Sequence, residues 1–176
     1  MLWRRTWVRD PHARALADRH YNRRSVGAAE FCPPGVRLVL VTAGYRALWV
    51  SHRAIDPRYR ADRLDAWFCT TFRNESSRLA SVLIRQAIEA TLDAWSDVPI
   101  PPDGFMTYID ERKVACQSGG LPYGWTFRAV GFEEAGCTRA RDLLRLRLAP
   151  ERLAAFVPRA APFAHGAVQL RLGADL

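Results

Sequence analysis

The chain has 176 residues, of which 49% are hydrophobic and 25% charged, and its formal net charge at pH 7 is +8. This length and mixture are typical of one folded domain with a buried core and exclude a disordered chain. No apolar run reaches the ~20 residues that span a bilayer, and the first ten residues lack the apolar stretch of a secretory signal, so we expect a cytoplasmic protein without a membrane partner.

The first part of the chain is expected to form a short strand, one helix and then two further strands. Residues 2–9 alternate in places and predict an edge strand. Asp10 is a suitable N-cap for a helix over 10–24. Residues 36–54 predict two strands around a tight turn near Gly44.

The middle of the chain contains the clearest helix. A third strand is expected at 66–74, directly before it. Apolar residues spaced three and four apart then predict a long helix over 76–95. A short strand at 105–110 follows, and a short helix over 123–130 is ended by Gly131.

The last part of the chain adds two strands and a tail. The remaining elements expected are strands at 131–138 and 142–149, a helical turn at 151–156 and a last strand at 167–172. The whole order indicates an α+β (mixed α/β) protein with a central, mostly antiparallel sheet and helices on both faces. We expect residues 1–149 to form the main domain and 150–176 to form a C-terminal extension packed on it.

Arginine supplies nearly all of the positive charge, because Lys113 is the only lysine. An excess of guanidinium groups favours partners that carry phosphate, either a nucleic acid or a phosphorylated cofactor. The four cysteines form no C-x-x-C pair, so we expect no dedicated metal site.

The segment "AVGFEEAGCT" (129–138), together with the order of elements, resembles the GNAT superfamily of acyl-CoA-dependent N-acyltransferases. In that family a short fourth helix ends in a Gly-Phe pair, matched here by Gly131 and Phe132, and a glycine follows, matched by Gly136. The resemblance implies that acetyl-CoA or another acyl-CoA binds where the fourth strand meets the long helix.

Three further features resemble the Mom-type phage proteins, which modify the exocyclic amine of adenine in DNA. They are the pair His20-Tyr21, Asp110 after the fifth strand and Tyr123 at the start of a helix. This resemblance implies a DNA base as the acceptor. The chain departs from ordinary acetyltransferases in two places: "RNESSRLAS" (73–81) contains no glycine, and Phe127 stands where the family often has a general-acid tyrosine.

The polar stretch "FRNESSR" (72–78) joins a strand to the long helix. A helix start carries unpaired N–H groups and a partial positive charge, so it can hold an anion. Ser76 and Ser77 would cap this helix, which leaves the following amides and the Arg78 guanidinium to face a phosphate. The cofactor-binding candidates are Asn74, Ser76, Ser77, Arg78, Leu79 and Ala80. The alternative is a capped helix whose Arg73 and Glu75 form surface ion pairs of little consequence.

The catalytic candidates are groups that can move a proton or hold a base. A neutral His20 can take a proton from an attacking amine, and the alternative is that it complements the dipole at a helix end. Tyr21 beside arginines can stack on an extruded base. Glu75 and Asp110 are candidate general bases, and a turn-forming role is the alternative for Asp110. Tyr123 would protonate a thiolate leaving group.

Arg23, Arg24 and Arg73 are the candidates for binding substrate or nucleic acid, and the segments 46–63 and 139–148 can contact a phosphate backbone. The resulting hypothesis is acyl transfer from an acyl-CoA to a DNA base. Two alternatives stay open: acetyl transfer to a small-molecule or protein amine, and a non-catalytic module that binds nucleic acid. The oligomeric state (a homodimer included) and the involvement of a metal such as iron also stay open.

Overall fold

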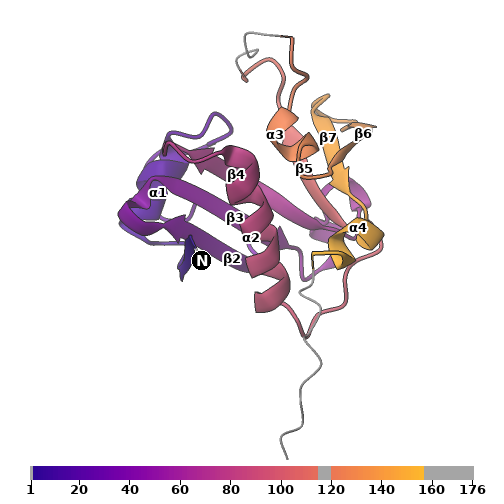
Figure 1. Ribbon diagram of the computed structural model, residues 1–176, viewed down its shortest axis with the longest axis horizontal. Coiled ribbons are helices and arrows are strands. Elements are labelled where there is room, and N and C mark those ends of the chain that lie inside the picture. The colour runs from indigo at the N-terminus through magenta and orange to yellow at the C-terminus, as the bar shows by residue number, and fades with distance from the viewer. Residues whose placement is uncertain (1, 115–119, 157–176) are drawn as a thin grey trace, which may run out of the picture.

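The computed structural model describes residues 2–114 and 120–156 and shows a seven-stranded sheet with helices packed on it (Figure 1). The strand order is β1-β2-β3-β4-β5-β7-β6, and β4 and β5 are the one parallel pair among otherwise antiparallel neighbours. The strands are β1 (Trp3–Thr6), β2 (Val36–Thr42), β3 (Ala47–Arg53), β4 (Trp67–Asn74), β5 (Phe105–Ile109), β6 (Glu133–Cys137) and β7 (Leu144–Leu148). The predicted α+β class with a mostly antiparallel sheet is confirmed.

Four α-helices lie within the described residues: α1 (Pro11–Asp18), α2 (Ala80–Ala94), α3 (Trp125–Arg128) and α4 (Pro150–Ala154). Figure 1 shows α2 lying across the central strands, with α3 and α4 near the end of the sheet formed by β5, β7 and β6. None of these helices is long and apolar enough to pass through a membrane.

The two longer helices cover opposite faces of the sheet. Alternate residues of a strand point to opposite faces, so each strand supplies two cores. On β2, Val39 and Val41 pack with Leu16 of α1. The neighbouring Leu38 and Leu40 pack with α2 in the larger cluster, which also contains the buried Trp49, Trp67 and Phe105. The sheet is therefore the middle layer of three.

Helix α1 begins as the sequence predicts and ends earlier. The Asp10 side chain accepts hydrogen bonds from the amides of His12 and Ala13, which makes it the predicted N-cap. The helix ends at Asp18 instead of residue 24. Turns follow, in which Arg23 donates to the Asp18 carboxylate and to two backbone carbonyls. The pair His20-Tyr21 therefore lies just beyond the helix, in a turn that leads away from it.

Helix α2 begins four residues later than the sequence predicts, and the expected serine cap is wrong. Its N-cap is Leu79, which supplies no side-chain hydrogen bond. The cause lies in Asn74: its Oδ1 accepts from the amide and hydroxyl of Ser76, and its Nδ2 donates to the carbonyl of Arg78 at 2.8 Å. These bonds fold residues 74–78 into a compact loop before the helix can start.

Strands β4 and β5 pair at their beginnings and then diverge. Their paired residues are Trp67–Phe105, Phe68–Met106 and Cys69–Thr107. Beyond this point β4 continues to Asn74 along β3, while β5 continues to Ile109 along β7. The Thr107 hydroxyl donates to the Cys69 carbonyl at 3.2 Å, at the last paired position. The sheet opens from there onward.

The C-terminal part of the described chain returns to the main core. Leu153 of α4 is fully buried in the cluster beneath α2, and Arg152 donates to the carbonyl of Gly131. The strand expected at 167–172 and most of the predicted extension 150–176 lie outside the described residues.

Candidate functional site

A cleft lies where β4 and β5 diverge. It holds about 780 Å³ of empty space, part of it open to solvent. The strands contribute residues 69–72 and 107–109, the turn after α1 contributes 20–22, and the segment leading into α3 contributes 121–127 together with Val114. One segment from each face of the sheet thus borders the cleft.

Aromatic rings shape the wall of the cleft on the α3 side. Phe127 of α3 packs edge-to-face against Phe72 of β4, with ring centroids 5.9 Å apart, and both rings contact Trp49. Tyr123 lies half-buried in the same wall and its carbonyl accepts a hydrogen bond from Arg128. The predicted candidate Tyr123 is thus placed at the cleft.

His20 and Tyr21 form the opposite wall as a stacked pair. Their ring centroids are 4.5 Å apart and the planes are inclined by 30°. The Asn22 amide donates to Nδ1 of His20 at 3.2 Å. Burial, and secondarily the positive charge of Arg73, lower the pKa of His20 from its ordinary value near 6.5 to about 4, although a hydrogen bond to the Phe72 carbonyl raises it in part. His20 is therefore neutral at physiological pH.

Tyr21 forms a hydrogen bond with the backbone of Asp110 and not with its carboxylate. Burial raises the pKa of Tyr21, and a hydrogen bond from the Asp110 amide lowers it in part. The Asp110 carboxylate accepts from Nε of Arg112 at 3.0 Å and from the Arg112 amide. This contact with Arg112 lowers the pKa of Asp110. Its carboxylate does not line the cleft and holds the turn at 110–114, which favours the turn-forming alternative.

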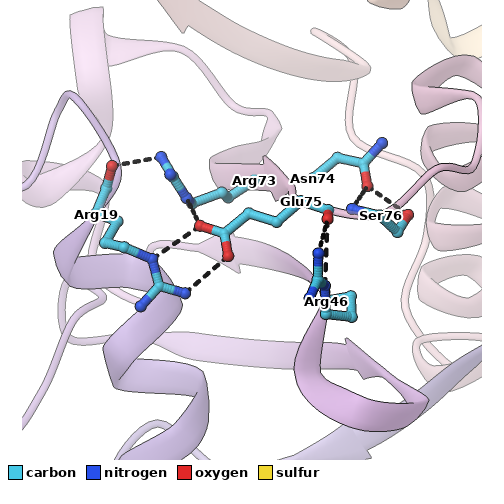
Figure 2. A network of polar contacts seen from close by, with 6 residues as sticks. All are labelled: Arg19, Arg46, Arg73, Asn74, Glu75 and Ser76. Carbon is cyan, nitrogen blue, oxygen red and sulfur yellow. Dashed lines mark hydrogen bonds and ion pairs between the residues drawn. The ribbon is translucent and has the colours of Figure 1, made fainter.

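Glu75 lies at the centre of the polar network shown in Figure 2. Its carboxylate accepts a two-pronged contact from Arg19, at 2.8 and 2.9 Å, and a bond from Nε of Arg73 at 2.6 Å. Its carbonyl accepts from Arg46, and its amide donates to the Arg46 carbonyl. Arg73 also donates to the carbonyl of Arg19. The network joins the end of α1, the start of β3 and the end of β4.

The contacts with Arg19 and, next, Arg73 lower the pKa of Glu75 from 4.5 to about 2. A carboxylate held ionised by two guanidinium groups is a poor proton acceptor. This geometry favours the ion-pair alternative for Glu75. Glu75 thereby ties Arg19, the residue directly before His20 and Tyr21, to the end of β4.

We expect Glu75→Gln to lower the free energy of unfolding at neutral pH by about 1 to 2 kcal/mol, since the pair with Arg19 is partly exposed. Because the folded-state pKa lies below the unfolded one, this stabilisation is present above pH 4.5 and is lost as pH falls through about 2. Urea unfolding at several pH values measures it. The matched control is Glu111→Gln at an exposed carboxylate; equal losses in both variants would contradict the assignment.

The start of α2 lies at the end of β4, one loop away from the cleft. Its N-cap supplies no side chain and its first turn contains no acidic residue. Ser77, Arg78 and Leu79 are exposed there, and Ala80 is half-buried. Asn74 and Ser76, two of the predicted cofactor-binding residues, bond with each other and shape the loop.

The predicted substrate-binding arginines fall into three environments. Arg23 has a side chain only 10% exposed and is bound to Asp18, so it holds the turn after α1. Arg24 is exposed. Arg73 belongs to the Glu75 network. The structure thus brings His20, Tyr21 and Tyr123 together at the cleft and leaves Glu75 and Asp110 beside it.

Three residues near the site are not among the individual site residues predicted from the sequence. Arg19 and Arg46 contact Glu75, and Thr107 lines the cleft. Arg19 contacts Glu75 across 56 positions, and no local pattern signals such a pair. Thr107 could have been noticed as a polar residue within an apolar strand.

Within residues 2–114 and 120–156, no three His, Cys, Asp or Glu side chains gather in a way that could hold a metal ion. Comparison with family models, curated proteins and solved structures gives no match to this chain.

Proposed function

We propose that the protein is a GNAT-like transferase that moves an acyl group from acetyl-CoA or another acyl-CoA to an amine. The preferred acceptor is the exocyclic amine of a DNA base, as the Mom-type resemblance implies. The observation that carries the proposal is the position of the cleft: the sheet opens between β4 and β5, beside the start of the long helix.

The opening of the sheet supports a site for two substrates. The GNAT resemblance leads us to expect that the sheet opens at the end of the fourth strand, toward the substrate. A thioester that enters from the α3 side would meet an acceptor that enters past His20 and Tyr21. Holding both reactants in one cleft lowers the entropic cost of bringing them together.

The start of α2 supports a site for the phosphates of the cofactor. Its first-turn amides have no capping side chain from Leu79, and helix N-termini attract anions. The exposed Arg78 would add a guanidinium to the phosphate oxygens. In place of the usual glycines, the hydrogen bonds of Asn74 to Ser76 and Arg78 set the shape of the loop that leads to these amides.

The transfer places each group in a defined role. The amine nitrogen attacks the thioester carbonyl, a C–N bond forms, and the C–S bond breaks to release the coenzyme A thiolate. Nδ1 of His20 takes the proton of the amine. The amine first replaces the Asn22 amide, whose hydrogen bond to Nδ1 is long. Tyr123, the phenol on the α3 side, donates a proton to the thiolate, so that the products are an amide and free coenzyme A.

Mass spectrometry of nucleosides tests the proposal in cells. DNA from a host that expresses the protein should contain a base heavier by one acyl-type group, and DNA from the same host carrying His20→Gln should not. Unmodified DNA beside an acetylated metabolite or protein would favour a different amine acceptor. If the DNA is unmodified and calorimetry shows no binding of acetyl-CoA, the proposal of an enzyme is wrong. The remaining alternative is then a module that binds nucleic acid.

A further inference from the structure

Most of the net positive charge of the protein lies in its first third. Residues 2–53 contain ten arginines and three carboxylates, a net charge of +7. Residues 54–156 contain fourteen lysines and arginines and fourteen carboxylates, a net charge of zero. The asymmetry comes both from the frequent arginines and from the few carboxylates of residues 2–53.

Three arginines of this first third and one of β4 form a continuous basic surface. We call it the basic belt, and its members are Arg4, Arg46, Arg19 and Arg73. The Arg4 guanidinium lies 4.6 Å from the ring centre of Tyr45, which precedes Arg46. Arg46 contacts the Glu75 carbonyl at 2.7 Å. The Glu75 carboxylate then contacts Arg19 and Arg73. The belt thus runs from the edge strand β1, over the turn between β2 and β3, to the end of α1.

Few negative charges oppose the belt. Glu75 is one carboxylate shared by two of its guanidinium groups. Asp10, the other carboxylate near Tyr45, is only 4% exposed and its oxygens are used by Thr6, Tyr45 and the first amides of α1. Arg4 and Arg46 are exposed and have no carboxylate partner among the described residues.

We propose that the basic belt is the docking surface for the sugar-phosphate backbone of a nucleic acid, and that it directs a base toward His20 and Tyr21. The belt ends at Arg19, the residue directly before this stacked pair at the cleft. Charges spread over four segments of the chain match a polyanion better than a small anion, which one helix start can hold. The inference rests on the proposed function, because it assumes that the acceptor base belongs to a nucleic acid.

Salt-dependent binding tests the belt without any acyl-CoA. Fluorescence anisotropy of a labelled DNA duplex and a single strand of about 20 nucleotides would be measured between about 50 and 200 mM salt. In Arg4→Gln/Arg46→Gln, the slope of log K against log salt should become smaller by about 2, with affinity about ten- to hundredfold weaker near 0.1 M salt.

Two sets of variants make the result specific. Arg139→Gln/Arg141→Gln removes the same charge from the segment 139–148, which the sequence offered as a rival contact for a phosphate backbone. Docking on the belt predicts that this variant keeps its affinity within about twofold. Arg4→Lys/Arg46→Lys keeps the charge and should keep the wild-type slope. If the double glutamine variant does not fold, Arg4→Gln alone should reduce the slope by about 1, since its guanidinium lies over the Tyr45 ring and forms no ion pair with the described residues.

Three outcomes would overturn the inference: no DNA binding at low salt, an equal loss in the Arg139/Arg141 variant, or a loss of acetyl-CoA binding instead of DNA binding. Calorimetry with acetyl-CoA on the same variants separates this result from the proposed function. If the belt variants bind DNA more weakly but the protein binds no acyl-CoA, the docking surface is supported and the acyltransferase activity is contradicted.

Discussion

Replacing Gly104 with alanine is expected to destabilise the protein by at least about 3 kcal/mol. Gly104 has φ +71°, and a Cβ added to it would lie 2.2 Å from the carbonyl oxygen of Leu148. Its own carbonyl accepts from the Trp67 amide at 3.0 Å, where the parallel pair of β4 and β5 begins. The methyl group would therefore push the end of β7 away from the start of β5, where the pairing of β4 with β5 also begins.

Urea unfolding followed by circular dichroism measures this loss, and Gly44→Ala is the matched control. Gly44 has a similar φ of +73°, but no described atom beyond its two chain neighbours lies within 4 Å of its added Cβ. The free energy of unfolding of Gly44→Ala should fall by only about 1 kcal/mol, which is the cost of an alanine in the left-handed conformation. Equal losses for the two variants would show that β7 does not lie against the start of β5 as described.

Replacing His20 with glutamine is expected to lower kcat/KM for acyl transfer by about 10²- to 10⁴-fold, the usual contribution of a general base. The affinity for acetyl-CoA should stay unchanged, because the start of α2 lies outside His20's contacts. In the wild type the base must be unprotonated, so the rate should fall as pH drops through about 4 and stay level around neutral pH. Transfer of a labelled acetyl group to an adenine-containing oligonucleotide measures both effects.

His12→Gln is the control for the His20 variant, because His12 is exposed on the first turn of α1 and does not line the cleft. It should keep the wild-type rate within about twofold. An NMR titration of His20 adds a measurement that needs no substrate. Its pKa should be about 4, and Arg73→Gln should raise it by removing a neighbouring positive charge. A wild-type rate in His20→Gln would remove this residue from the mechanism.

Local patterns predicted most of the fold because local chemistry decides it. Asp10 caps α1 through bonds to amides two and three residues away, which a sequence displays directly. The alternating Leu and Arg of 144–148 forms the predicted strand, with its leucines buried. The start of α2 was wrong by four residues because Asn74 and Ser76 satisfy each other, and two polar residues offer more than one such pairing.

The candidate site was less predictable because its partners are distant in sequence. The polar stretch "FRNESSR" was correctly located at the end of β4, but its Glu75 is held by Arg19, 56 positions earlier. Asp110 likewise has its carboxylate engaged by Arg112, and only its amide reaches Tyr21. A residue type and its position along a strand do not reveal which guanidinium will reach it.

A crystal structure with coenzyme A tests the central claim most directly. We expect the cofactor's pyrophosphate at the amides that begin α2, near Arg78, and its sulfur in the opening between β4 and β5, facing His20 and Tyr123. Coenzyme A bound elsewhere, or a cleft that stays empty at saturating coenzyme A, would contradict it.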